Sequence, residues 1–319
     1  MHAMISASAT QPLRRVELAP QVLGSHDVRV RVRAAGVNPV DWKMREGGPL
    51  RLVQRLLGPR GPFVVGIDFA GDVVEIGAKV ADLAVGDRVV GGTNFARGQR
   101  GSYADEVVVR PDQCARLPAS VSYEEAACLP VAAVTASIAI DEHRGIGPGM
   151  RVLVLGATGG VGLAALQLAR LRGATAVGVC STRNVPVVEA EGAIAIDYGR
   201  GDALAAARAH GPFDLVLHAV GTGTYPLRGC VRLLAPKGIV ELVVPTPRDM
   251  LSIALTPWRV RTVLARPDRA RLTPLVAALE AGALRPRVEA TFPLHEAEAA
   301  HARSRAGKVV GKLLLRADA

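Results

Sequence analysis

Cysteine is scarce in this sequence, and its placement excludes several kinds of site. The four cysteines among 319 residues lie far apart, with no Cys-x-x-Cys pair and no metal-knuckle spacing: Cys114, Cys128, Cys180 and Cys230. A disulfide framework or a structural zinc site needs clustered cysteines, so neither is expected. Scattered cysteines are typical of a reducing compartment, and we expect the protein in the cytoplasm.

Aromatic residues and lysine are also rare. Aromatic residues make up 3% of the chain, so there is little side-chain material for stacking on nucleic-acid bases. Only five of the 39 basic residues are lysine, and the arginines are spread along the chain without a dense basic run. Despite the formal net charge of +10, nucleic acid is therefore not an expected partner.

Long hydrophobic runs are missing as well. Residues 1–15 have no apolar core of the length that a secretory signal needs. The uncharged run Ala126–Ile140 is shorter than the roughly 18 residues of a membrane span and contains Pro130. This run is typical of a buried helix, and no membrane is expected as a partner.

The chain is long enough for about two domains. The period of its hydrophobic pattern changes along the sequence. Up to about Leu117, short segments such as Val28–Val32 alternate with period two, which predicts an antiparallel, barrel-like β region. From Arg151 onward, strands and helices alternate, beginning with the buried strand Val152–Leu155. Such alternation predicts a doubly wound parallel sheet with right-handed crossovers.

The predicted fold is therefore α/β, with two domains of different construction. Helices and a strand that follow Pro257 are too few for a third domain, so we expect them to complete the first. This places a discontinuous domain over residues 1–120 and 258–319, and a Rossmann dinucleotide-binding domain over residues 121–257. The nearly uncharged strand Gly238–Val244 is expected at the exposed edge of the parallel sheet, where pairing with a second copy would give a homodimer.

A glycine-rich segment, GATGGVG, lies between a predicted strand and a predicted helix, as a dinucleotide-binding turn requires. Gly159 is expected to permit the tight turn, Gly160 to let the pyrophosphate approach the backbone, and Gly162 to let helix and strand pack closely. The following helix supplies free N–H groups and a positive dipole end. The predicted cofactor-binding turn comprises Ala157, Thr158, Gly159, Gly160, Val161 and Gly162, with alanine in place of one usual glycine.

The end of the second predicted strand indicates which dinucleotide binds. NAD sites carry an acidic residue about 20 residues beyond the glycines, on the adenosine ribose. Here the segment Cys180–Asn184 reads CSTRN and contains no acid. The Ser181 hydroxyl and the Arg183 guanidinium would bind a 2′-phosphate through charge-assisted hydrogen bonds, so NADP is the predicted cofactor. The alternative is that Arg183 is a solvated surface residue.

Ordered motifs throughout nearly the whole chain resemble the medium-chain dehydrogenase/reductase superfamily, in particular its zinc-free quinone oxidoreductase-like branch. The motifs are GVNPVDWK (36–43), GIDFAGDVVEIG (66–77), GDRVVG (86–91), GSYADE (101–106), LPVAAVTA (129–136), GATGGVG, CSTRN and GKVVGKLLL (307–315). The resemblance implies a GroES-like catalytic domain from both chain ends, a central Rossmann domain, a cleft between them and a homodimer.

The resemblance also implies roles for individual residues. Asn38 and Thr135 resemble residues that line the nicotinamide, and Tyr198 resembles a tyrosine that touches the 2′-phosphate in NADPH-using members. We expect Thr135 to orient the nicotinamide, and Asn38 or Lys43 to stabilise negative charge on the acceptor oxygen. Val220 and Gly221 complete the expected cofactor site. His218 stands where many relatives carry aspartate, and it is expected to be a hydrogen-bonded histidine beside the sheet.

Zinc is not expected, because the resemblance shows which ligand positions have changed. Zinc members carry cysteine at the position of Asn38 and His-Glu at the positions of Ile67 and Asp68. A catalytic zinc needs three protein ligands, and Ile67 has no ligating atom. Cys128 falls near a third ligand position but stands alone. Asp41 and Asp68 are expected to hold loops rather than to exchange protons.

The expected chemistry follows from these residues. Without zinc no Lewis acid polarises an alcohol or ketone, whereas a quinone or an α,β-unsaturated carbonyl delocalises the charge that hydride brings. We therefore predict NADPH-dependent reduction of a quinone or enone, with a substrate pocket formed around Arg45–Phe63 and Met250–Arg261. The alternatives are an enoyl-thioester reductase acting on polyketide or fatty acyl chains, and a non-catalytic NADPH-binding protein.

Overall fold

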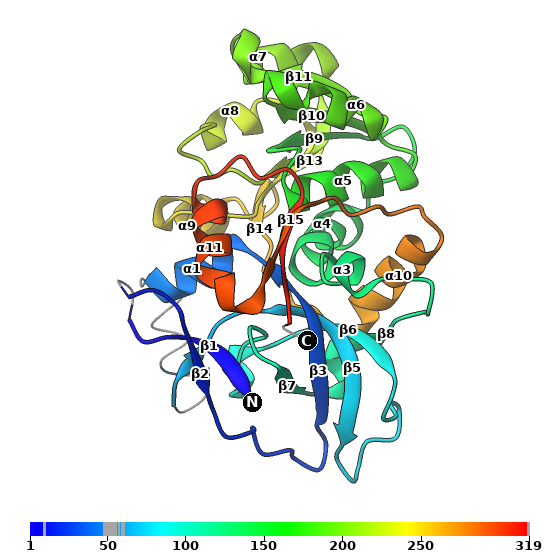
Figure 1. The fold of residues 1–319 in the computed structure, drawn as a ribbon. Helices are drawn as coiled ribbons and strands as arrows, with labels where there is room; N and C mark the ends of the chain where they lie inside the picture. The colour runs from blue at the N-terminus through cyan, green and yellow to red at the C-terminus, as the bar shows by residue number, and fades with distance from the viewer. Residues whose placement is uncertain (9–10, 47–55, 57, 59–60, 318–319) are drawn as a thin grey trace. The chain divides into compact units, whose positions relative to one another are not determined.

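Short strands make up most of the first of two compact units, which comprises Met1–Val131, Arg266–Gly282 and Pro286–Ala319 (Figure 1). The computed structural model describes residues 1–8, 11–46, 56, 58 and 61–317. Strand β3 (Val28–Val37) begins with alternating burial, because Val28, Val30 and Val32 are buried while the arginines between them are more exposed. This is the side-chain alternation of a pleated strand with one face on a core.

The main sheet of this unit brings both ends of the sequence together. Its strand order is β15-β16-β3-β5-β6-β8, and β7 also pairs with β3. Neighbours are antiparallel except β15 and β16, which run parallel. The bounds are β5 (Asp68–Ile76), β6 (Arg88–Gly92), β7 (Glu106–Val109), β8 (Cys114–Arg116), β15 (Val288–Pro293) and β16 (Lys312–Arg316). The pairing of β16 with β3 places the C-terminal strand in the first unit.

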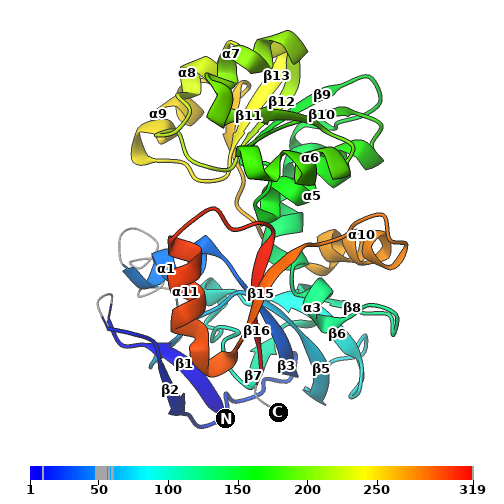
Figure 2. The same ribbon diagram turned by 45° about the horizontal axis from the view of Figure 1, so that its top comes forward.

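A smaller sheet and several helices complete the first unit. The small sheet has the order β2-β1-β4, formed by β1 (His2–Ser6), β2 (Arg14–Glu17) and β4 (Phe63–Val64). The α-helices are α1 (Pro39–Glu46), α3 (Tyr123–Ala126), α10 (Arg269–Glu280) and α11 (Ala297–Arg305). Helix α11 packs against β15, β16 and α1, as Figure 2 shows.

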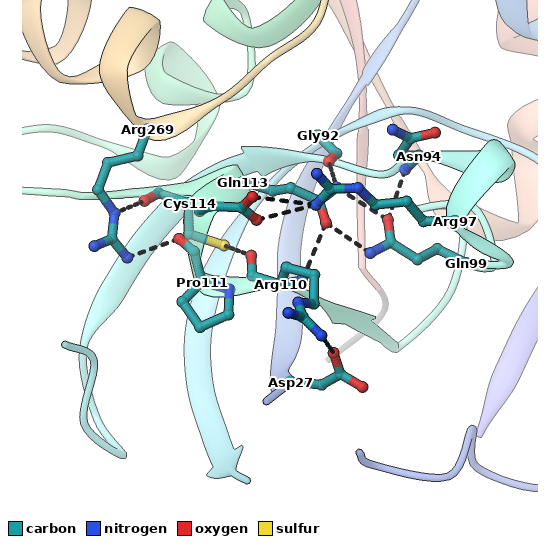
Figure 3. A network of polar contacts seen from close by, with 11 residues as sticks. Asp27, Gly92, Asn94, Arg97, Gln99, Arg110, Pro111, Gln113, Cys114 and Arg269 are labelled. Atoms are coloured by element: carbon teal, nitrogen blue, oxygen red, sulfur yellow. Dashed lines mark hydrogen bonds and ion pairs between the residues drawn. The ribbon is translucent and has the colours of Figure 1, made fainter. Parts of the chain in front are cut away.

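Side-chain amides hold the segment between β6 and β8. Gln99 and Gln113 are buried and exchange two hydrogen bonds, with Nε2 to Oε1 distances of 2.6 and 3.0 Å (Figure 3). Gln113 Nε2 also donates to the carbonyl of Gly92 at 2.8 Å. At the start of α10, Arg269 donates to the carbonyl of Cys114 at 2.9 Å. Amide groups and one arginine therefore fix this part of the unit.

Six parallel strands form the sheet of the second unit, which comprises Ala132–Ala265 and Ala283–Arg285 (Figure 1). The strands are β9 (Arg151–Leu155), β10 (Thr175–Cys180), β11 (Ile194–Asp197), β12 (Phe213–His218), β13 (Leu234–Leu242) and β14 (Val260–Thr262). Their order is β11-β10-β9-β12-β13-β14, and all neighbours are parallel. This is the strand order of the doubly wound dinucleotide fold, so the predicted Rossmann architecture is confirmed.

Helices connect these strands: α5 (Gly160–Leu171), α6 (Val185–Ala190), α7 (Ala203–Ala207), α8 (Leu227–Val231) and α9 (Pro247–Leu255). Helix α4 (Val134–Ser137) precedes the first strand. Helix α5 packs its buried leucines and alanines on β9 and β10. The chain leaves this helix at Gly173, whose φ of +73° suits glycine and whose N–H donates to the carbonyl of Arg170.

The expected sheet edge is wrong. β13 lies between β12 and β14, so the predicted edge strand Gly238–Val244 is an interior strand that begins earlier, at Leu234. The edge on this side is β14, whose three residues are too few for a periodic pattern to reveal. Because β14 joins the parallel sheet, residues 258–265 lie in the second unit, whereas residues 121–131 lie in the first, where α3 packs on β3 and β5.

The predicted buried helix Ala126–Ile140 belongs to a longer helical segment, Tyr123–Arg144. Two stretches of this segment are π-helical, Leu129–Ala133 and Ile138–Arg144. Within the described residues it is the one helix with the length and composition to cross a membrane, but most of its apolar window is buried inside the protein. Such burial is typical of a core helix.

Candidate active site and cofactor-binding residues

The turn after β9 requires glycine at two positions for steric reasons. Gly156 has a φ of +88°, and a Cβ there would lie 2.6 Å from Val220 Cγ1. A Cβ on Gly162 would lie 2.2 Å from the Gly156 carbonyl oxygen, so the start of α5 approaches the turn as closely as only glycine allows. The expected packing role of Gly162 fits this geometry.

The role expected of Gly159 is wrong in one respect. Its φ of −74° is open to any residue, so the tight turn depends on Gly156, which the predicted site residues omit. The nearest atom to a Cβ on Gly159 would be the Gly156 carbonyl oxygen at 3.7 Å. The space above Gly159 is therefore open, as a closely approaching ligand needs. The first N–H groups of α5, from Gly160 to Gly162, have no acceptor within the helix and suit an anionic group.

Two further turn residues have structural partners. Thr158 Oγ1 accepts a hydrogen bond of 3.1 Å from Asn184 Nδ2, and both side chains are buried. This bond ties the glycine turn to the segment after β10. The methyl group of Ala157, where the usual pattern has glycine, faces Gly178 of β10, and a Cβ on Gly178 would lie 2.8 Å from it. Glycine at 178 thus accommodates the alanine of the turn.

The expected 2′-phosphate residues lie at the end of β10, next to a carboxylate that the sequence reading missed. Ser181 precedes a short 3₁₀ turn that contains the exposed Arg183. Strand register pairs Cys180 with Asp197, whose Oδ1 accepts hydrogen bonds from Thr182 Oγ1 and the Gly199 N–H. Arg200 Nε lies 3.3 Å from Asp197 Oδ2. The carboxylate is the last residue of the third strand, β11, so inspection of the segment after the second strand does not find it.

A cavity of about 740 Å³ opens within the second unit beside the glycine turn. It is lined by Gly156, Tyr198 and Val220 together with residues of α7, α8 and the segments that flank them. Three exposed arginines also line it: Arg208, Arg228 and Arg232. Sequence analysis did not single them out, because arginine is common throughout this chain. Tyr198 and Val220 of the predicted cofactor site thus share one cavity, which does not include Ser181, Arg183 or Gly221.

In the first unit, three strand ends gather a buried polar cluster around Asn38. Asn38 directly follows β3, Asp68 begins β5 and Lys312 begins β16, whose register places Leu313 opposite Val37. The Lys312 ammonium donates to Asn38 Oδ1 at 2.6 Å and to Asp68 Oδ2 at 3.0 Å. Asn38 Nδ2 donates to the same Asp68 oxygen at 2.9 Å. All three residues are at least 95% buried, and sequence analysis did not identify Lys312 as a site residue.

The carboxylates of this cluster hold loops, as expected. Asp68 Oδ1 accepts a hydrogen bond from the Val131 N–H at 3.0 Å, and Asp41 Oδ2 accepts one from the Asn38 N–H at 2.7 Å. Burial raises the pKa of Asp68, although Lys312 and the hydrogen bonds from Asn38 and Val131 oppose this rise. Burial, reinforced by the charge of Asp68, raises the pKa of Asp41 to about 7. Two buried acids therefore stand directly beside Asn38.

The other expected catalytic residues have different surroundings. Lys43 lies on α1 with its ammonium 5.5 Å from the ring centre of Trp42, and partial burial lowers its pKa. Thr135 belongs to α4 of the second unit and is buried. His218 Nε2 lies 2.9 Å from the Tyr225 carbonyl oxygen, but its buried Nδ1 has no partner among the described residues, so only one ring nitrogen is hydrogen-bonded.

The expected substrate loops are described only in part. Most of Arg45–Phe63 lies outside the described residues. The segment Met250–Arg261 forms most of α9 and leads into β14. Within it Leu251, Leu255 and Trp258 are exposed, so this loop presents apolar side chains.

Two family profiles match the chain. That of the alcohol dehydrogenase GroES-like domain matches residues 24–119, and that of a zinc-binding dehydrogenase domain matches residues 190–315. The second description raises the question of whether this chain's residues fit zinc.

The residues present do not fit zinc. The described part of the chain contains no group of three or more His, Cys, Asp or Glu side chains that could hold a metal. Burial raises the pKa of the Cys128 thiol to about 12, which disfavours the thiolate that zinc needs. Asn38 Oδ1 and Asp68 Oδ2 already accept hydrogen bonds from the Lys312 ammonium. A protein cation therefore takes the oxygen atoms that a metal would need.

The relatives agree with the fold. The chain is 32% identical to the chloroplastic quinone-oxidoreductase QR1 of Triphysaria versicolor over 95% of this chain and 93% of that protein. The structure of the quinone oxidoreductase from Coxiella burnetii has a TM-score of 0.88 at 29% identity, over 99% of this chain and 98% of that one. A structure described as an NAD-dependent alcohol dehydrogenase has a TM-score of 0.84 at 26% identity, covering 99% of each chain. The chain therefore belongs to the quinone oxidoreductase-like branch of the medium-chain dehydrogenase/reductase superfamily, oxidoreductases that bind a nicotinamide cofactor.

Proposed function

We propose that this protein is an NADPH-dependent, zinc-independent oxidoreductase that transfers hydride to a quinone or an α,β-unsaturated carbonyl. The observation that carries the proposal is the buried cluster of Asn38, Asp68 and Lys312. A Lewis acid would need metal ligands at these positions, whereas this cluster offers an amide N–H as a hydrogen-bond donor. Conjugated acceptors need only hydrogen-bond donors for their developing charge, since they delocalise it.

We assign some residues to the cofactor and others to the acceptor. When bound, the nicotinamide supplies a hydride. We assign the pyrophosphate to the N–H groups at the start of α5 above Gly159, and the nicotinamide carboxamide to Thr135. Asn38 Nδ2–H would stabilise the acceptor oxygen as it gains negative charge. One hydride and one proton convert a quinone to a hydroquinone, and one hydride and one proton likewise saturate an enone, with water as the proton source.

The preference for NADPH over NADH is part of the proposal. It is supported by the basic side chains at the adenosine end: Arg183 and Arg200 after β10 and β11, and Arg208, Arg228 and Arg232 at the cavity. Two carboxylates lie at this end. Asp197 already accepts two hydrogen bonds and pairs with Arg200, and Asp202, which lines the cavity, accepts hydrogen bonds from two N–H groups at the start of α7. Four free, buried cysteines fit a reducing compartment, which we propose is the cytoplasm.

One assay tests the proposal and its alternatives. The purified protein is mixed with NADPH and a panel of quinones, enones and enoyl thioesters, and loss of NADPH absorbance is followed, with NADH in parallel. We expect turnover with a quinone or enone and a higher kcat/KM for NADPH than for NADH. Turnover with enoyl thioesters alone would replace the proposal by the acyl reductase, and tight NADPH binding without any turnover would replace it by a non-catalytic role.

A further inference from the structure

Every N–H of the Lys312 ammonium has an acceptor inside the protein. Its Nζ lies 2.6 Å from Asn38 Oδ1, 3.0 Å from Asp68 Oδ2 and 3.4 Å from the Val37 carbonyl oxygen. An ammonium has three donors and no acceptor, so these three oxygens satisfy it completely. Lys312 therefore has no donor left for a ligand, and any influence it has on bound molecules passes through its partners.

The partners of Lys312 fix the orientation of the Asn38 amide. Asn38 Oδ1 faces the ammonium, and one Nδ2–H faces the Asp68 carboxylate at 2.9 Å. In the flipped amide, N–H groups would face the ammonium and the oxygen would face the carboxylate, so both contacts would be repulsive. The cation and the carboxylate thus select one orientation. In it a single Nδ2–H of Asn38 has no acceptor among the described residues.

We propose that Lys312 is a positioning residue for hydride transfer: with Asp68, its ammonium locks and polarises the Asn38 amide so that the remaining Nδ2–H points to the acceptor oxygen. The inference rests on the proposed function and adds to it the group that makes Asn38 a directed donor. A cation bound to an amide oxygen withdraws electrons from the nitrogen and strengthens its N–H as a donor. No bond is broken at Lys312, which acts through charge and hydrogen bonding alone.

The variant that tests this removes both charges together. Lys312→Met alone would leave the buried Asp68 carboxylate without its cation, and such a loss is strongly destabilising in itself. The double variant Lys312→Met/Asp68→Asn leaves no buried charge in the pair and removes the two charges that orient Asn38. Its matched control is Lys79→Met, which removes an exposed lysine of the same unit.

The first measurement does not depend on activity. The chain has three asparagines, Asn38, Asn94 and Asn184, so ¹⁵N-asparagine labelling gives three side-chain NH₂ pairs in an NMR spectrum. The substitution Asp68→Asn adds a fourth pair to the spectrum of the double variant, which the single variant Asp68→Asn identifies. We expect the Asn38 pair to shift or broaden in the double variant while the pairs of Asn94 and Asn184 stay in place, and all three to stay in place in Lys79→Met. An unchanged Asn38 pair in the folded double variant would overturn the inference.

The second measurement asks whether the pair acts through Asn38. The double variant is made in the wild-type and Asn38→Ala backgrounds, and kcat is measured with an acceptor that the wild type reduces. We expect a loss of roughly 10- to 100-fold in the first background and less than about three-fold in the second, with NADPH affinity retained in both. Equal losses in both backgrounds would show a general structural role and overturn the inference. If no acceptor is reduced by the wild type, the proposed function fails, and the NMR result alone decides whether Lys312 orients Asn38.

Discussion

The hydroxyl of Tyr103 donates a hydrogen bond of 3.1 Å to Asp41 Oδ2, and both side chains are at least 99% buried. The same oxygen accepts the N–H of Asn38, so Asp41 fixes the residue at which β3 gives way to α1. On its far side, the Tyr103 hydroxyl lies 3.4 Å from His301 Nε2, and burial lowers the pKa of His301 to about 4. Asp41 Oδ1 has no partner among the described residues. An acid in these surroundings is costly to ionise.

The stability of the protein is predicted to depend on pH through Asp41. Burial raises its pKa from 3.8 to about 7. The protonated acid therefore contributes fully to the stability of the folded protein below pH 3.8, and this contribution is lost as the pH rises through about 7. Asp41→Asn keeps an oxygen that accepts the bonds from Asn38 and Tyr103 and carries no charge. Between about pH 4 and pH 8 we expect the free energy of unfolding of the wild type to fall by about 1 to 4 kcal/mol relative to that of this variant.

Denaturant unfolding at a series of pH values measures this difference. Asp112→Asn is the control, because its carboxylate is largely exposed and pairs with Arg97 on the surface. The control should follow the wild type at every pH. If Asp41→Asn also follows the wild type, Asp41 titrates near its ordinary value and the assignment is wrong.

Cofactor preference is predicted to depend on Arg183. Loss of a charge-assisted hydrogen bond costs about 1.5 to 3 kcal/mol, so Arg183→Ala should weaken NADPH binding roughly 10-fold or more. NADH has no 2′-phosphate, and its affinity should change little. Arg170→Ala removes an exposed arginine from α5 and serves as the control. Titration of cofactor fluorescence gives one dissociation constant for each of the three proteins with each cofactor, and equal wild-type affinities for NADPH and NADH would contradict the prediction.

The metal content is predicted from the ligand positions. Asn38 and Ile67 stand where zinc members carry ligands, and the oxygens near them accept hydrogen bonds from Lys312. Protein purified from zinc-supplemented medium should contain far less than one zinc per chain by elemental analysis. Its activity should survive treatment with a chelator. One tightly held zinc per chain, lost together with activity, would show that the ligand analysis is wrong.

The fold was largely predictable because its long elements carry clear periods. The alternation of Val28–Val32 and the buried strands around GATGGVG led to the correct two architectures. Among the elements missed, α8 has five residues and β14 has three, while α9, with nine, was expected as part of a substrate loop. Segments as short as α8 and β14 are fixed by the neighbours on which they pack, so their own residues carry little signal. Because β14 was not predicted, the edge of the parallel sheet was assigned to the wrong strand.

The candidate site was predictable only where its residues lie within one motif. Asn38 and Asp41 were found because they share GVNPVDWK. Lys312 stands in GKVVGKLLL and was not identified, since its partner Asn38 lies 274 residues away and comes within reach only through the pairing of β16 with β3. Asp197 was missed for the same reason, because strand register brings it beside Cys180. Contacts between distant strands are set by topology, which local patterns do not encode.

A dimer remains predicted, with a different edge from the one first expected. β14 is the edge of the parallel sheet on this side, and exposed apolar residues flank it: Trp258 is 65% exposed and Leu264 68% exposed. Pairing with a second copy would cover these side chains and the unpaired strand edge. Light scattering at micromolar concentration should give a dimer for the wild type and a smaller mass for Trp258→Glu/Leu264→Glu. Val85→Glu changes an exposed residue of the other unit and should remain dimeric. A monomeric wild type would contradict the prediction.

The last prediction concerns Lys43 and its charge. Its ammonium lies over the Trp42 ring on α1, partial burial lowers its pKa, and the nearby Glu46 opposes that shift. If this cation stabilises the acceptor oxygen, Lys43→Ala should lower kcat/KM roughly 10- to 1000-fold while NADPH affinity is retained.

The pH profile separates a charge effect from lost packing. Because the lysine must be protonated to act, kcat/KM of the wild type should fall at alkaline pH below the ordinary lysine pKa of 10.5. Lys43→Met fills a similar volume without a charge, so its smaller kcat/KM should show no such fall. Lys79→Met is the control and should keep both the rate and the profile of the wild type. Wild-type turnover in Lys43→Ala would show that this cation takes no part, leaving Asn38 as the donor to the acceptor oxygen.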